Sequence, residues 1–308
     1  MAKIVPPSSQ YFSARDGVHL GYRFYTNAAP RAVLILLPGF ALTSRDYVAF
    51  CSALAQLAGT AVYSLDLRGH GDSAGRLGDV DYAGQLCDDL HDAFAHVRER
   101  HRDIPVGLCA HSSGCSLAIQ LLSAPNPPGP MGLFLIAPVF CGHLEFDRHQ
   151  TRLHRLVHFC QQGRKHAKVV PSKLQIKQQF HFFLGRYVLA RFFPGGGRMT
   201  VLKVRPNDKT PWMTFTRRFY QGYRCADPRT QLAELSCPVW MMVGEEDEFT
   251  LPQAVISMLH WHVAPSLLRD IQHVRGVGHF TVFSVAAMLL ARWLNPILSD
   301  KPAARGDA

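Results

Sequence analysis

Strand-length apolar segments alternate with helical patterns along most of this 308-residue chain, and the alternation limits the folds that it can adopt. Residues 32–40 and 132–137 form almost uninterrupted apolar runs, as do strands that are buried on both faces. Residues 82–97 instead place their large apolar side chains on one face of a helix. This order predicts a mostly parallel sheet with helices on both faces. The expected strands are 32–40, 61–67, 105–110, 132–137, 239–244 and 268–274, the expected helices are 47–57, 82–97, 114–122 and 280–294, and a hairpin of 11–13 and 18–25 precedes them.

The alternation stops after Pro138 and resumes at Pro238, so the middle of the chain is predicted to be an insertion. Residues 141–235 contain 18 Lys and Arg against 5 Asp and Glu, whereas the rest of the chain has 15 against 18. The whole net charge of +10 therefore comes from this insertion. The expected parts are a first core segment 1–138, an insertion 139–235, a second core segment 236–297 and a flexible tail 298–308.

The composition is that of a globular protein. Apolar residues make up 47% of the chain and charged residues 18%, which excludes disordered and collagen-like classes. No apolar run is long enough to span a bilayer, and the first ten residues lack the apolar centre of a secretory signal. We therefore expect a cytoplasmic protein, with at most a peripheral membrane contact. Its eight cysteines contain no C-x-x-C pair and are expected to be reduced thiols.

A serine stands where a predicted strand meets a predicted helix, in Ala110-His111-Ser112-Ser113-Gly114. The residues two before and two after Ser112 are small, which lets the chain turn sharply and expose the hydroxyl. The pattern approximates G-x-S-x-G, the nucleophile elbow, with Ala in place of the first Gly. Ser112 is therefore the predicted nucleophile, and a Ser-Gly turn without chemistry is the alternative.

An acid and a histidine follow the serine in the order that such an elbow requires. Carboxylates come directly after the strand 239–244, at the edge where open α/β sheets gather their sites. His279 lies in a glycine-flanked loop before the last helix. We expect Asp247 to hold one imidazole nitrogen while His279 takes the Ser112 proton and later returns it to the leaving group. A surface acidic turn and an ordinary loop histidine are the alternatives.

These segments resemble the α/β-hydrolase superfamily, and most closely its lysophospholipase and monoacylglycerol lipase-like branch, often labelled serine aminopeptidase-like. The resemblance covers about residues 10–138 and 236–297 and rests on LLPGF, LDLRGHGDSAG, AHSSG, VGEEDEF and GVGHF. It implies an α/β-hydrolase fold with a largely helical lid inserted after strand 6. It also selects Asp247, the fourth residue of Gly-Glu-x-Asp, as the acid, with Glu246 and Glu248 as alternatives.

The resemblance implies an oxyanion hole made by the backbone N–H groups of Phe40 and Ser113. The chain departs from the family here, because Pro38-Gly39 stands where His-Gly is usual. This change keeps the backbone donor and leaves open how its loop is supported.

The segment from Asp66 to Gly71 also matches the family. It is expected to form a structural loop beneath the site, with Asp66 and Arg68 paired. A substrate contact of His70 is the alternative.

The basic insertion is expected to form the lid. Aromatic residues among its cations favour transient docking on an anionic membrane surface, whereas a helical lid with its own small core is the plainer interpretation. No nucleic-acid partner is expected, because no binding module is recognisable. The aromatic residues in question are Phe180, Phe182, Phe183, Phe192, Phe193, Trp212, Phe215 and Phe219.

The sequence therefore predicts a serine hydrolase that cleaves carboxylic esters, of acyl, lysophospholipid or monoacylglycerol type, through an acyl-enzyme on Ser112. The alternatives are peptide, lactone or carbon–carbon cleavage by the same residues, and a non-catalytic binding protein. No cofactor or metal is expected, because His154 and His158 lack the Glu of H-E-x-x-H and Gly195-Gly196-Gly197 lacks a strand-to-helix setting. The oligomeric state stays open.

Overall fold

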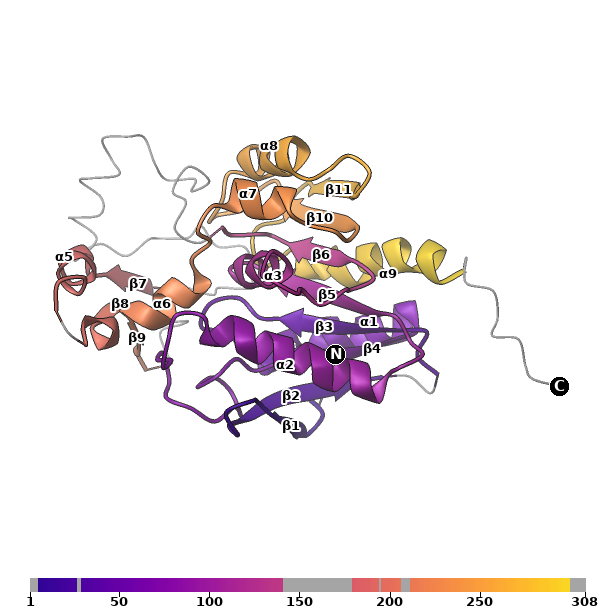
Figure 1. The fold of residues 1–308 in the computed structure, drawn as a ribbon. Helices are drawn as coiled ribbons and strands as arrows, with labels where there is room; N and C mark the ends of the chain where they lie inside the picture. The colour runs from indigo at the N-terminus through magenta and orange to yellow at the C-terminus, as the bar shows by residue number, and fades with distance from the viewer. Residues whose placement is uncertain (1–4, 27–28, 141–178, 194, 206–210, 300–308) are drawn as a thin grey trace.

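The computed structural model describes residues 5–26, 29–140, 179–193, 195–205 and 211–299. Within these residues the main sheet has eight strands in the order β1-β2-β4-β3-β5-β6-β10-β11 (Figure 1). The pairs β1–β2 and β2–β4 are antiparallel, and all other neighbours are parallel. The predicted mostly parallel sheet is confirmed. Its strands are β1 (Ser9–Ser13), β2 (His19–Tyr25), β3 (Ala32–Leu37), β4 (Thr60–Leu65), β5 (Val106–His111), β6 (Leu133–Ile136), β10 (Val239–Gly244) and β11 (Leu268–Val274).

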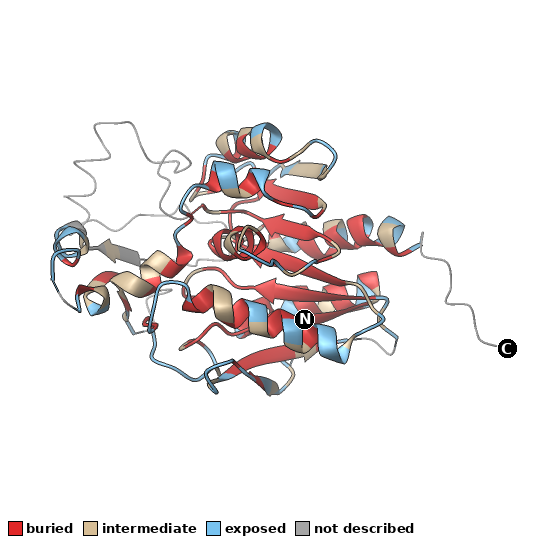
Figure 2. Cartoon of the chain, in the orientation of Figure 1, coloured by how far each residue is buried: buried red, intermediate tan, exposed pale blue. Residues whose placement is uncertain are grey.

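Helices cover both faces of this sheet, as the apolar runs predicted. Every residue of β3 is buried, and successive residues belong to two different apolar clusters. Figure 2 shows the central strands as buried along their length. Helices α1 (Val48–Ala58) and α9 (Phe283–Ser299) contribute to one cluster, and α2 (Gln85–Arg100), α3 (Gly114–Leu122), α7 (Pro228–Ala233) and α8 (Pro252–His262) to the other.

The described part of the insertion contains a small sheet as well as helices. Strands β7 (Gln179–Phe182), β8 (Thr200–Arg205) and β9 (Met213–Thr216) form an antiparallel sheet in that order. Short helices α5 (Leu184–Leu189), η3 (Gly196–Arg198) and α6 (Arg217–Tyr223) accompany it. The described part of the insertion thus holds a sheet beside its helices, and β-branched Val201 and Val204 of β8 are completely buried. Residues 141–178, 194 and 206–210 of the expected lid lie outside the described residues.

The corner between β9 and α6 is anchored to the main domain. Arg218 donates two hydrogen bonds of 2.7 Å to the carboxylate of Asp79, and Thr216 donates a third through its hydroxyl. The Thr216 backbone N–H also bonds the carbonyl of Gly78. A Cβ at Gly78 would lie 2.0 Å from the Thr214 carbonyl oxygen, so only glycine permits this approach. The base of the insertion is therefore fixed against the loop that follows β4.

The expected pairing of Asp66 with Arg68 is wrong. Arg68 instead bonds Asp89 of α2 at 2.6 and 2.8 Å and contacts Asp16 at 2.8 Å. The Asp66 carboxylate accepts the backbone N–H groups of Ser44 and Asp72, at 2.6 and 3.0 Å. The chain turns out of the sheet after β4, so loop amides without a ladder partner become the nearest donors to Asp66.

No helix among the described residues is long and apolar enough to cross a membrane.

Helix α2 offers a comparison between a buried and a surface ion pair. The side chains of Arg68 and Asp89 are 6% and 5% exposed, whereas Arg15, which pairs with Asp92, is 48% exposed. Replacing Asp89 by Ala leaves the buried Arg68 charge with Asp16 alone and should cost about 3–5 kcal/mol of unfolding free energy. Asp92→Ala should cost less than about 1 kcal/mol. Urea unfolding of both variants measures the difference, and equal losses would show that burial does not set the strength of these pairs.

Candidate active site

Ser112 occupies a strained turn between β5 and α3. Its φ of 53° lies in the left-handed region, which a serine adopts only when the surrounding structure requires it. The backbone N–H of Ser112 bonds the carbonyl of Ile136, and its carbonyl accepts from Cys115. A Cβ at Gly114 would lie 2.6 Å from the Pro38 carbonyl oxygen, so the residue two after the serine must be glycine. The turn therefore places the Ser112 hydroxyl beyond the carboxyl end of β5.

The structure brings Ser112, His279 and Asp247 together. The Nε2 atom of His279 lies 2.8 Å from the Ser112 Oγ, and its Nδ1 atom lies 2.8 Å from an Asp247 oxygen. His279 is 1% exposed and Asp247 is completely buried. The three residues follow β5, β10 and β11, whose carboxyl ends meet at one edge of the sheet. An imidazole held in this way can accept the serine proton and stay in one tautomer.

Asp247 is held as a carboxylate. Its second oxygen accepts the backbone N–H groups of Phe249 and Thr250, each at 2.9 Å. Burial alone would raise the pKa of the Asp247 carboxyl. The adjacent His279 ring and the two backbone donors outweigh burial, so the pKa lies below its ordinary value of 3.8. At neutral pH a negative charge therefore stands next to the imidazole.

The two other carboxylates considered for this role lie elsewhere. The Glu246 side chain is exposed. Glu248 accepts the backbone N–H of His279 at 2.7 Å and so contacts the main chain of the histidine instead of its ring. The sequence alone does not show whether such a residue binds the histidine backbone or its ring, because either contact needs only an acidic residue near position 247.

The loop carrying Phe40 runs directly against the serine turn. A Cβ at Gly39 would lie 3.1 Å from the Ser112 Cβ and 3.2 Å from His111 Nδ1. The backbone N–H groups of Phe40 and Ser113 have no hydrogen-bond acceptor among the residues that the structure describes. Both predicted oxyanion donors are thus close to the serine turn and are not consumed by other backbone groups there.

Tyr47 supports this loop through a hydrogen bond. The proline at position 38 has no side-chain group that could form one. The Gly39 N–H donates to the Tyr47 hydroxyl at 2.9 Å, and that hydroxyl lies 2.8 Å from His111 Nδ1. Burial raises the pKa of Tyr47 well above 10 and lowers the pKa of His111 well below 6.5, so both stay neutral. One phenol therefore links the residues that precede Phe40 and Ser112. Sequence patterns did not identify this role, since Tyr47 matched an apolar position of a helix.

Aromatic residues of the insertion pack on the Phe40 side chain. The ring centroids of Phe215 and Tyr223 lie 4.5 and 4.9 Å from that of Phe40. His70 is buried and stacks on Phe215 and Phe219, at 5.8 and 5.4 Å, so it packs between its loop and the insertion. Burial lowers the pKa of His70. The insertion thus contributes directly to the surroundings of a predicted oxyanion donor.

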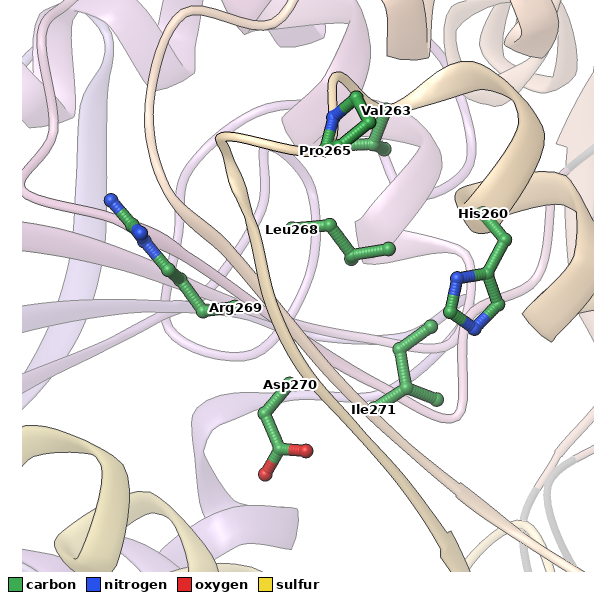
Figure 3. A pocket seen from close by; sticks show the side chains of 7 residues that line it. All are labelled: His260, Val263, Pro265, Leu268, Arg269, Asp270 and Ile271. Atoms are coloured by element: carbon green, nitrogen blue, oxygen red, sulfur yellow. The ribbon is translucent and has the colours of Figure 1, made fainter.

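A cavity of about 440 Å³ opens between the end of α8 and the edge strand β11. Figure 3 shows the side chains that line it. Its lining contains none of the predicted site residues, so it is separate from the candidate site. Among the described residues no group of three or more His, Cys, Asp or Glu side chains could hold a metal ion. The His154 and His158 pair lies outside those residues.

The chain is similar to known proteins and matches one family model. A family model described as "Serine aminopeptidase, S33" matches residues 28–181, which is half of the chain and includes Ser112. Protein phosphatase methylesterase 1 of Bos taurus is 27% identical over 139 residues, covering 42% of this chain and 36% of the bovine protein. The protein of Mus musculus is also 27% identical, over 42% of this chain and 35% of its own length. The chain thus spans only about a third of the length of these relatives.

Solved structures share the fold over almost the whole chain. A soluble variant of monoglyceride lipase from Saccharomyces cerevisiae superposes with a TM-score of 0.69 at 18% identity, covering 96% of each chain. Est1E from Butyrivibrio proteoclasticus, solved with ferulic acid, superposes with a TM-score of 0.62 at 14% identity, covering 94% of this chain and 100% of its own. The predicted α/β-hydrolase fold is confirmed, and the chain belongs to the serine aminopeptidase S33 family of serine hydrolases.

Proposed function

We propose that this serine hydrolase cleaves carboxylic esters through an acyl-enzyme formed on Ser112. The observation that carries the proposal is the continuous chain of contacts from the Ser112 hydroxyl through His279 to the buried carboxylate of Asp247, each 2.8 Å long. A non-catalytic binding protein has no need of a strained serine turn aimed at a buried imidazole. This geometry therefore favours catalysis over binding alone.

In the proposed reaction the Ser112 oxygen attacks the ester carbonyl while His279 Nε2 takes the hydroxyl proton. Asp247 keeps the Nδ1 proton on the far side of the ring and stabilises the imidazolium that forms. The N–H groups of Phe40 and Ser113 stabilise the negative carbonyl oxygen of the tetrahedral intermediate. The alcohol leaves with the proton from His279, and water then attacks the acyl-serine by the same steps, which releases the acid and restores Ser112.

The proposed substrates are acyl, lysophospholipid or monoacylglycerol-like esters. Similar proteins support this class of substrate. They are a monoglyceride lipase solved with a substrate analogue, a protein solved with ferulic acid and a protein phosphatase methylesterase. Peptide, lactone and carbon–carbon cleavage use the same residues, so a panel of such substrates beside esters of increasing acyl length separates these reactions.

Ser112→Ala should lose p-nitrophenyl ester turnover by at least about 10⁴-fold while keeping its thermal midpoint, because only the nucleophilic oxygen is removed. A fluorophosphonate probe should label the wild-type protein at Ser112 and leave the variant unlabelled. Mass spectrometry of the labelled peptide identifies the site. Wild-type protein that resists the probe, or label on another residue, would contradict the proposal.

Tyr47→Phe should lower kcat by about tenfold to a hundredfold with little change in KM. The substitution removes the acceptor of the Gly39 N–H and loosens the loop that carries the Phe40 donor. Tyr63→Phe is the matched control, because its hydroxyl also bonds a histidine, His101 Nε2 at 2.9 Å, in a part of the core away from the loop. Steady-state kinetics should show a loss for Tyr47→Phe only. Equal activities of the two variants would remove Tyr47 from the loop's support.

The proposal includes transient docking of the insertion on an anionic membrane surface. Phe192 and Phe193 are 76% and 59% exposed, whereas Phe215 and Phe219 are buried. The exposed cations Arg186, Arg191 and Arg198 lie in the same stretch, and its described residues from 179 to 226 include no Asp or Glu. Exposed aromatic rings beside exposed arginines suit an interface of acyl chains and anionic headgroups.

The double variant Phe192→Ser/Phe193→Ser should bind vesicles that contain phosphatidylserine at least about tenfold more weakly than the wild-type protein, because two apolar anchors are lost. Trp261→Ser is the matched control, since Trp261 is 79% exposed on α8, outside the insertion. Co-sedimentation with phosphatidylserine-containing and pure phosphatidylcholine vesicles measures the affinities. Wild-type protein that sediments with neither, or a control that weakens equally, would rule out docking through these rings.

A further inference from the structure

Two neighbouring carboxylates contact two different nitrogen atoms of His279. Asp247 reaches Nδ1 of the ring, and Glu248 accepts the backbone N–H at 2.7 Å. The second bond joins an ionised acceptor to a main-chain donor, which is stronger than a bond between neutral groups. The ring and the backbone of the same histidine are therefore each held by an acid from the loop after β10.

The chain leaves a space for the Glu248 carboxylate. A Cβ at Gly278 would lie 2.7 Å from both Glu248 carboxylate oxygens and 2.9 Å from the carbon between them, and these are the three nearest atoms. The φ of Gly278 lies outside the left-handed region, so the backbone itself would admit another residue. A Cβ at position 278 would therefore displace the Glu248 carboxylate, whereas glycine leaves the space that this carboxylate fills.

The loops on both sides of this contact are fixed. Asp247 accepts the N–H groups of Phe249 and Thr250, which holds the turn that carries Glu248. The Gly278 N–H donates to the Thr281 hydroxyl at 2.7 Å, at the approach to α9. Glu248 therefore connects two ordered turns across the backbone of His279.

We propose that Glu248 is a positioning residue that holds the His279 main chain, so that the ring contacts Ser112 and Asp247 at the same time. Glu248 acts through His279 and touches no reacting atom. This inference rests on the proposed function. A displacement of the base by about 1 Å can cost a hundredfold in rate, so the loss of this support acts on kcat and leaves substrate affinity unchanged.

The first test compares Glu248→Ala and Glu248→Gln with the matched control Glu246→Ala, whose side chain is exposed. With a p-nitrophenyl ester, Glu248→Ala should lower kcat about tenfold or more at an unchanged KM, because the charge-assisted bond is lost. Glu248→Gln keeps an oxygen acceptor and should retain kcat within about threefold. Glu246→Ala should match the wild-type protein. A wild-type kcat in Glu248→Ala, or equal losses in the Ala and Gln variants, would overturn the proposal.

A double-mutant cycle with Gly278 tests the contact itself. Gly278→Ala should lower kcat about as much as Glu248→Ala, because the new Cβ displaces the carboxylate. In the Glu248→Ala background the space is empty, so adding Gly278→Ala should cause no further loss. If Glu248→Ala folds poorly, the kcat of Gly278→Ala alone still tests the contact. Full additivity of the two losses would show that Gly278 does not serve Glu248.

Hydrogen exchange separates this inference from the proposed function. The His279 amide should exchange at least about tenfold faster in Glu248→Ala than in the wild-type protein, whether or not esters are cleaved. Wild-type protein with a protected amide but no fluorophosphonate labelling would refute the esterase proposal alone. An active wild-type protein with equal amide exchange in both forms would refute the role of Glu248 alone.

Discussion

The site depends on the left-handed turn that the chain makes at Ser112. A φ of 53° at a serine costs about 1–3 kcal/mol, and close contacts around the turn maintain it. Gly114 abuts the carbonyl of Pro38, and Gly39 lies against Ser112 itself. The same crowding brings the Phe40 loop beside the nucleophile. The strained turn at Ser112 thus brings the Ser112 hydroxyl close to the predicted oxyanion donors.

Hydrogen bonds hold both the ring and the backbone of His279. Asp247 and Glu248 reach the ring and the backbone, while Tyr47 holds the opposite loop through Gly39. All three supports are buried or partly buried, so water does not compete fully for their hydrogen bonds. Such support from all sides is how a fold keeps reacting groups within tenths of an ångström of their working positions.

The insertion has two ends with different surroundings. Near the main domain, Asp79 and Arg218 anchor the corner that places Phe215 on Phe40, so this end is part of the site's wall. Between α5 and η3, Phe192 and Phe193 are exposed among arginines. The charge excess is spread over residues 141–235 as a whole, and the sequence did not separate their buried aromatic residues from the exposed ones. That separation depends on which rings face the core after β8 and β9 pair.

Periodicity and local motifs determined the alternating elements, the serine turn and the order of serine, acid and histidine, because these depend on residues close in sequence. The tertiary structure alone decided which distant groups meet. Arg68 contacts Asp89 on α2 and not the nearby Asp66, and a tyrosine from a helical pattern became a support for Gly39. The contact between Glu248 and the His279 amide likewise joins residues from two separate loops. A side chain's partner is set by where the turns direct it, and sequence spacing does not encode that direction.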